Sequence, residues 1–209
     1  MKETILRVKN LTVFYHGCKE PAVNQVNFAL DPGSSVGLIG ESGSGKTSIA
    51  LAIMGLLNKR ATLEGEVYYQ GIELGGLSVK ERNSFNWRKI AMVFQNSLET
   101  LNPVLTVWEQ IEECLRRHTK LTKVEIKEKV KELLADVGLD PAWGLFYPHQ
   151  ISGGMRQRVL TAMALSCDPD VLIIDEPTTA LDVKAKEEMV ELLADLHREK
   201  KFALLVISH

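Results

Sequence analysis

The sequence has few of the features that mark specialised classes of protein. Its three cysteines, Cys18, Cys114 and Cys167, are widely spaced and form no Cys-x-x-Cys pair, which argues against a disulfide framework or a zinc site and leaves packing roles for them. Lysine and arginine (25) nearly balance aspartate and glutamate (27), so no basic excess favours nucleic acid as a partner. The apolar run at 202–207 is too short to span a bilayer, and charged residues interrupt the start of the chain. We therefore expect a cytosolic chain with a substantial core.

A glycine-rich segment beginning at residue 40 has the spacing of a triphosphate-binding loop. It follows the apolar run 35–39, which we expect to form a buried strand, and precedes an apolar stretch at 48–54 that we expect to be helical. Glycines let successive backbone N–H groups face a phosphate, and the N-terminus of the following helix favours the same charge. In this pattern the lysine reaches the β- and γ-phosphates and the threonine hydroxyl ligates Mg²⁺. The sequence therefore predicts a nucleotide and Mg²⁺ site with these binding residues: Gly40, Glu41, Ser42, Gly43, Ser44, Gly45, Lys46, Thr47 and Ser48.

Two acidic residues follow another apolar run in the second half of the chain. The run at 171–174 has the length of a buried strand and ends at Asp175 and Glu176. Adjacent carboxylates point in different directions, so they can have different roles. We expect Asp175 to hold the metal, usually through water, and Glu176 to orient and polarise the water that attacks the γ-phosphate.

The order of the remaining runs predicts an α/β fold. Short strand-like runs separated by turns indicate an antiparallel sheet near the nucleotide, at 6–8, 11–15, 26–30 and 66–69. Threonine and glutamate three residues apart form capping boxes at 106–109 and 122–125, which predict two helices. In the second helix, Gly138 is a natural stop after apolar residues at helical spacing, namely Ile126, Val130, Leu133, Leu134 and Val137.

Residues 151–158, which read Ile-Ser-Gly-Gly-Met-Arg-Gln-Arg, open a further helix just before the strand at 171. These residues resemble the signature motif of the ATP-binding cassette (ABC) family. With the phosphate loop and the acidic pair in the same order, the resemblance to this family covers essentially the whole chain. It implies one P-loop NTPase domain with an antiparallel β subdomain and an inserted α-helical subdomain. We place the nucleotide-binding core and β subdomain at about 1–96 and 168–209, and the helical subdomain at about 97–167.

Four further positions match family residues singly. Tyr15 matches the aromatic residue that stacks on adenine, although an aromatic side chain in a strand is more often part of the core. Gln95 matches the glutamine that senses Mg²⁺ and the attacking water and contacts the transmembrane partner. Asp182 matches the acid of a loop that crosses the dimer interface, and His209 matches the switch histidine at the γ-phosphate. The resemblance thus implies catalytic roles for Lys46, Gln95, Glu176 and His209, and metal binding by Thr47, Gln95 and Asp175.

The resemblance also implies that the working unit contains two such chains. Ser152, Gly153 and Gly154 of one subunit would close on the nucleotide held by another, because a helix N-terminus offers N–H groups to an anion. Around residues 95–107 and in the signature motif, the sequence resembles the ATPases of bacterial dipeptide, oligopeptide and nickel importers. This implies an ATPase that energises import of peptides, nickel or metal chelates.

The implied partners are those of a peripheral subunit at the cytoplasmic face of the cell membrane. They are transmembrane permease subunits, a second ATPase subunit that is identical or paralogous, and indirectly an extracellular solute-binding protein, with ATP and Mg²⁺ as cofactors. The alternative is a soluble ABC ATPase of nucleic-acid repair or translation, which the short helical segment and single phosphate loop disfavour. Family members continue beyond the switch histidine, so we expect the chain to be truncated at that point. The sequence does not identify the cargo.

Overall fold

The structure is a computed structural model that describes residues 4–94, 100–176 and 182–208. The chain divides into two compact units. One unit, which we call the sheet unit, comprises Met1–Met92, Asp170–Glu176 and Lys201–His209; the other, the helical unit, comprises Val93–Pro169 and Pro177–Lys200. We expected residues 168–209 to lie wholly with the core, whereas residues 177–200 group with the helical unit.

The first sheet of the sheet unit is antiparallel, with the order β2-β1-β4-β5. Its strands are β1 (Leu6–Tyr15), β2 (Val23–Leu30), β4 (Ala61–Tyr69) and β5 (Ile72–Glu73). The runs at 6–8 and 11–15, expected as separate strands, form one strand with a bulge, because the pairing register shifts around Asn10. Asn10 has a φ of 47°, and its N–H donates to the side chain of Asn27 at 2.9 Å. The bulge therefore keeps its backbone hydrogen-bonded while the strand continues.

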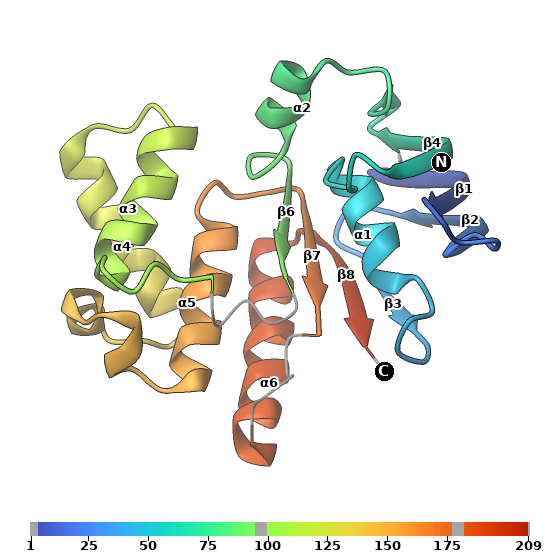
Figure 1. The fold of residues 1–209 in the computed structure, drawn as a ribbon. Coiled ribbons are helices and arrows are strands. Elements are labelled where there is room, and N and C mark those ends of the chain that lie inside the picture. The colour runs from blue at the N-terminus through green and yellow to red at the C-terminus, as the bar shows by residue number, and fades with distance from the viewer. Residues whose placement is uncertain (1–3, 95–99, 177–181, 209) are drawn as a thin grey trace. The chain divides into compact units, whose positions relative to one another are not determined.

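The second sheet has the order β3-β8-β7-β6, and β8 pairs in parallel with both β3 and β7 (Figure 1). Its strands are β3 (Ser35–Ile39), β6 (Ile90–Val93), β7 (Val171–Asp175) and β8 (Ala203–Ser208). All residues of β6 and β7 are buried. β7 is a central strand of this sheet, where burial on both faces is usual, whereas β6 lies at the edge opposite β3. We expected β3 to be buried as well, but it is an edge strand with no buried residue.

Two helices complete the sheet unit. α1 (Lys46–Met54) directly follows the glycine-rich loop, so it starts two residues earlier than expected. α2 (Val79–Phe85) begins with a capping box. The Ser78 side chain accepts a hydrogen bond from the Glu81 N–H, and the Glu81 carboxylate accepts one from the Ser78 N–H. We did not expect a helix at the position of α2.

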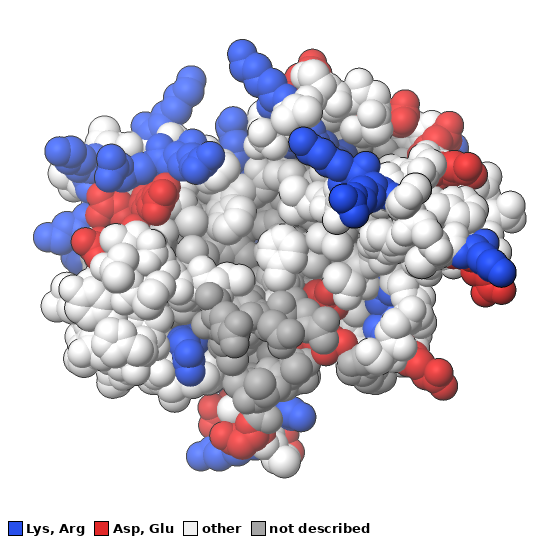
Figure 2. Space-filling view, viewed as in Figure 1, with Lys and Arg blue, Asp and Glu red and all other residues white. Residues whose placement is uncertain are grey.

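The helical unit contains α3 (Val107–His118), α4 (Lys123–Asp136), α5 (Gly153–Leu165) and α6 (Val183–Lys200), with 3₁₀ turns at Pro141–Leu145 and Pro148–Gln150. Both predicted capping boxes are present, with Thr106 and Thr122 as the first members. The five predicted apolar residues of the α4 region are all buried, and Gly138 ends it with a φ of 69°. Figure 2 shows basic side chains beside acidic ones where α3 and α4 lie in Figure 1. In the described part of the chain, no helix is long and apolar enough to cross a membrane.

Candidate functional site

The glycine-rich loop joins β3 to α1 through a residue that must be glycine. Gly45 precedes the first residue of α1 and has a φ of 89°, a conformation that other residues rarely adopt. A Cβ atom on Gly45 would lie 2.1 Å from the carbonyl oxygen of Ala22. The loop therefore fits against the chain just before β2 only because this position has no side chain. This close packing holds the N-terminus of α1 at the end of β3, where the sequence predicted a phosphate site.

Lys46 lies against the loop that it follows. Its ammonium group donates to the carbonyl oxygens of Gly40 at 2.6 Å and Glu41 at 2.8 Å, and to the Ser44 hydroxyl at 3.4 Å. The residue is only 8% exposed. The lysine thus points its charge back over the loop, into the space that the loop's own carbonyls border. A phosphate entering the loop would meet this ammonium group together with the N-terminus of α1.

The loop and the strand carrying the acidic pair meet through one hydrogen bond. The hydroxyl of Thr47 donates to Oδ2 of Asp175 at 2.7 Å, and the Asp175 residue is 1% exposed. Residues 128 positions apart in sequence are thus joined, because α1 packs beside β7 in the same unit (Figure 1). A hydroxyl and a carboxylate at this spacing are hard oxygen ligands of the kind Mg²⁺ prefers. The two residues fit a magnesium site.

Glu176 has an unusual backbone conformation. Its φ of 51° places it in the left-handed region, and its N–H donates to the carbonyl oxygen of Ile207 on β8 at 3.0 Å. Asp175 is the last residue of β7, so the chain turns sharply between the two acids. Such strain persists where the surroundings impose it and often marks a functional site. No local pattern in the sequence predicted this turn.

Tyr15 ends β1 beside the first turn of α1. Its hydroxyl and that of Ser48 lie 3.0 Å apart and form a hydrogen bond. The proposed adenine-stacking residue and the phosphate loop are therefore neighbours within the sheet unit. Stacking on adenine itself stays a prediction.

The remaining predicted site residues of the described chain belong to the helical unit. Ser152 is the N-cap of α5, and its hydroxyl accepts from the Met155 N–H at 3.2 Å; Gly153 and Gly154 form the first turn of that helix. Asp182 has the same role before α6, since its carboxylate accepts from the Ala185 N–H at 2.9 Å. Both side chains thus have a local structural role in addition to any contact with a nucleotide. Gln95 and His209 lie outside the described residues.

Arg158, the last residue of the signature motif, has a structural role that we did not expect. Its guanidinium donates to the Val137 carbonyl at 2.9 Å and to Glu188 of α6 at 3.4 Å. The arginine therefore ties α5 to the end of α4 and to α6. These contacts depend on how the three helices pack, so no local pattern around Arg158 predicted them.

Two cysteines also differ in environment. Cys18 is exposed, so the expected packing role is wrong for it. Cys114 is partly buried, and its burial raises the pKa of its thiol to about 12. A thiol that stays protonated suits the packing role expected for it.

A family model described as "ABC transporter" matches residues 23–179, and the chain belongs to this family. It is 41% identical to the oligopeptide transport ATP-binding protein AppD of Bacillus subtilis over 99% of this chain and 65% of AppD. It is 43% identical to the oligopeptide transport ATP-binding protein OppD of Haemophilus influenzae over 98% of this chain and 65% of OppD. The chain therefore spans about two thirds, 65%, of the length of these two relatives.

The fold is that of an ABC ATPase. A dimeric, post-hydrolysis structure of the ATP-binding cassette MJ0796, bound to ADP and Pi, superimposes with a TM-score of 0.85 and 33% sequence identity. The match covers 98% of this chain and 88% of the MJ0796 chain. The predicted fold class is confirmed, with its antiparallel sheet, parallel sheet and helical part.

Proposed function

We propose that this chain is the ATP-binding and ATP-hydrolysing part of a bacterial peptide importer. The observation that carries the proposal is the 2.7 Å contact between Thr47 and Asp175, which joins the phosphate loop to the acidic end of β7. Peptide as the cargo is supported by the relatives, whose names describe oligopeptide transport. Nickel and metal chelates, which the sequence left open, have no comparable support.

The chemistry follows from the residues of the sheet unit. The Lys46 ammonium and the N–H groups at the start of α1 bind the phosphates of ATP, while Thr47 and Asp175 hold Mg²⁺. When bound, Mg²⁺ neutralises charge on the phosphates. Glu176 accepts a hydrogen bond from the attacking water and takes its proton. In this proposal Asp175 serves the metal and Glu176 serves the water.

The signature residues act on a second subunit in this proposal. Ser152 and Gly154 at the start of α5 contact the γ-phosphate of a nucleotide bound to the partner ATPase subunit, as the dimeric state of MJ0796 makes reasonable. Release of the γ-phosphate weakens the dimer, and permease subunits convert that change into alternating access. The protein is then peripheral to the cytoplasmic face of the membrane, with an extracellular solute-binding protein as an indirect partner.

A pair of variants tests the catalytic part. Glu176→Gln is expected to bind ATP yet hardly hydrolyse it, because the amide cannot accept the proton of water. Lys46→Ala is expected to lose affinity for ATP, because its ammonium group is removed from the phosphates. Binding of a fluorescent ATP analogue and release of phosphate are measured for both. Turnover of Glu176→Gln near that of the unaltered protein would refute the base assignment.

Co-purification tests the transport part. The protein is tagged in its own cells, membranes are solubilised gently, and the associated proteins are identified by mass spectrometry. We expect polytopic permeases and a second ATPase subunit. Recovery of ribosomes or DNA-repair proteins would instead support the alternative, a soluble ABC ATPase of translation or repair, and leave only the ATPase chemistry standing.

A further inference from the structure

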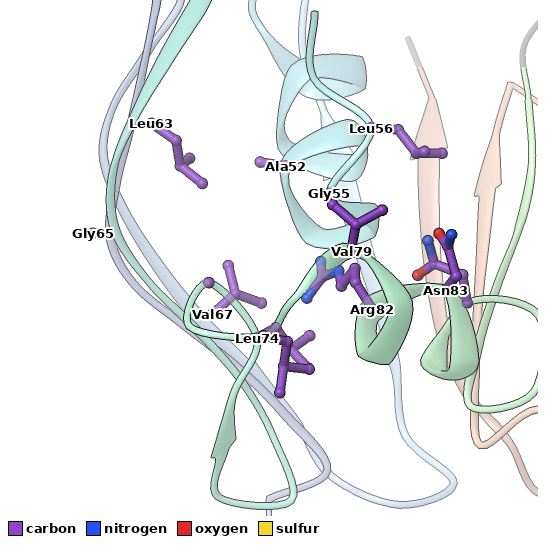
Figure 3. Close-up of a pocket in the computed structure, with 13 residues that line it drawn as sticks. Ala52, Gly55, Leu56, Leu63, Gly65, Val67, Leu74, Val79, Arg82 and Asn83 are labelled. Atoms are coloured by element: carbon purple, nitrogen blue, oxygen red, sulfur yellow. The ribbon is translucent and has the colours of Figure 1, made fainter. Parts of the chain in front are cut away.

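A pocket of about 270 Å³ lies in the sheet unit at the C-terminal end of α1 (Figure 3). Its walls come from the last turn of α1, from β4, from the loop after β5 and from α2. Most of its lining is apolar, and the side chains concerned include Ala52, Leu56, Leu63, Val67, Leu74 and Val79. Leu56, Leu63 and Val79 are 48%, 40% and 78% exposed. Exposed apolar side chains that line one hollow are typical of a binding site.

The pocket is separate from the nucleotide-binding loop. α1 begins at Lys46 beside that loop and ends at Met54 beside the pocket. A helix of this length spans about 14 Å at 1.5 Å per residue. A ligand in the pocket therefore does not overlap a nucleotide on the loop.

Among the described residues that line this pocket, Arg82 is the only one with a charged side chain. In Figure 3 its guanidinium reaches from α2 past Gly55 toward the β4 side of the pocket. It donates to the carbonyl oxygens of Ile53 and Met54, at the end of α1. Among the described residues its Nη1 has no hydrogen-bond partner, and burial alone lowers the pKa of the guanidinium to about 10. The C-terminal carbonyls of α1 offset part of this positive charge, while the Nη1 donor lacks an acceptor among the described residues, which an anionic ligand would supply.

Asn86 presents a second unsatisfied group at the same place. Its Nδ2 donates to the Met54 carbonyl oxygen at 2.9 Å, which fixes the orientation of the amide. Its Oδ1 is then buried without a hydrogen-bond partner among the described residues. One unsatisfied donor and one unsatisfied acceptor thus lie at the apolar pocket, at the end of the same helix.

We propose that this pocket binds a small organic carboxylate with a short, branched aliphatic tail. The carboxylate pairs with Arg82, which turns toward the cavity that it already lines, and the tail packs against the leucine and valine side chains of the wall. Arginine suits this role because its planar guanidinium offers paired donors to a carboxylate. The volume is sufficient, since an apolar cavity of about 150 Å³ is known to hold benzene.

Titration of isocaproate into the protein, followed by isothermal calorimetry or ligand-observed NMR, tests the proposal. Isocaproamide is the matched neutral ligand, with the same tail and no charge. Both titrations are made with saturating ADP and Mg²⁺, so that the phosphate loop is occupied. We expect saturable binding of isocaproate and binding of the amide that is at least about tenfold weaker.

Two variants at an exposed position of the rim test the role of Arg82 without touching the cap of α1. Val79→Glu places a carboxylate one helical turn before Arg82, where it competes with the ligand for the guanidinium, whereas Val79→Gln has nearly the same shape and no charge. We expect isocaproate to bind Val79→Glu about tenfold more weakly than Val79→Gln. The proposal is overturned if isocaproate does not bind, if the amide binds equally well, if ADP abolishes binding, or if the two variants bind alike.

Discussion

The contact between Gly45 and the chain before β2 allows a sharp test of how the phosphate loop is held. We consider Gly45→Ala and, as its matched control, Gly43→Ala in the same loop. Both glycines have positive φ, 89° and 80°, so alanine at either position is strained by roughly 1–2 kcal/mol. Part of that strain is offset because alanine restricts the unfolded chain more than glycine does. The surroundings of the two positions, however, differ completely.

A Cβ atom on Gly43 would meet nothing within 4 Å, whereas on Gly45 it would lie 2.1 Å from the Ala22 oxygen and 3.1 Å from a methyl group of Val23. Carbon and oxygen atoms in contact normally stay about 3.3 Å apart, so the loop or the start of β2 must move by about 1 Å. Overpacking of this kind costs about 1–3 kcal/mol. We therefore expect Gly43→Ala to lower the free energy of unfolding by about 1 kcal/mol and Gly45→Ala to lower it by about 3 kcal/mol.

The assay is urea unfolding without nucleotide, because a bound ligand would stabilise the two variants to different extents. The midpoint reports the change as long as the slope of the transition is unchanged. Affinity for a fluorescent ADP analogue gives a second reading, in which Gly45→Ala is expected to lose more than Gly43→Ala. Equal midpoints for the two variants would refute the argument, since the contacts with Ala22 and Val23 distinguish the two positions.

Three further perturbations have expected outcomes. Glu176→Gly should be about 1 kcal/mol more stable than Glu176→Gln in urea unfolding, because glycine adopts a φ of 51° without strain; equal stabilities would contradict a strained turn. Thr122→Ala should lower stability by about 1 kcal/mol, because the hydroxyl caps α4. Hydrogen bonds from Thr122 also lower the pKa of Glu125. The stability that the ionised Glu125 contributes should therefore be lost as the pH falls below about 4.5. Unfolding curves at acid pH check this. The folded chain keeps the Cys114 proton that the unfolded chain releases above pH 9.0, so stability should fall as the pH rises from there toward about 12. Cys114→Ala should make the free energy of unfolding fall less steeply with pH in this range. An equally steep fall in the variant would contradict the role assigned to the Cys114 thiol.

Local patterns allowed much of this fold to be predicted. The capping boxes at Thr106 and Thr122 and the apolar spacing of α4 depend on residues within one or two helical turns, and all were confirmed. The same kind of pattern occurs at Ser78 and Glu81, yet α2 was missed. Its seven residues include no buried side chain, so the amphipathic repeat that marked the other helices is absent. A capping box alone, without that repeat, is too weak a signal.

Parallel-strand topology explains why part of the site could be predicted from separate motifs. β7 and β3 both pair in parallel with β8, so their carboxyl ends lie at the same edge of the sheet, where ligands bind in open α/β sheets. The loop after β3 and the acids after β7 are therefore brought together whatever the length of chain between them. The hydrogen bond between Thr47 and Asp175 is the direct result.

The conformation of Glu176 could not be predicted in the same way, because its cause is not local. Glutamate has no preference for positive φ, and no glycine or asparagine follows β7 to suggest a left-handed residue. The backbone N–H of Glu176 instead donates to the carbonyl oxygen of Ile207 on the neighbouring strand. Ile207 lies 31 residues further along the chain. Backbone hydrogen bonding between β7 and β8 thus continues one residue past the end of β7, to the residue with the positive φ. The sequence shows only that two carboxylates are adjacent. Whether they can take different roles, as proposed for Asp175 and Glu176, therefore depends on the register of two strands.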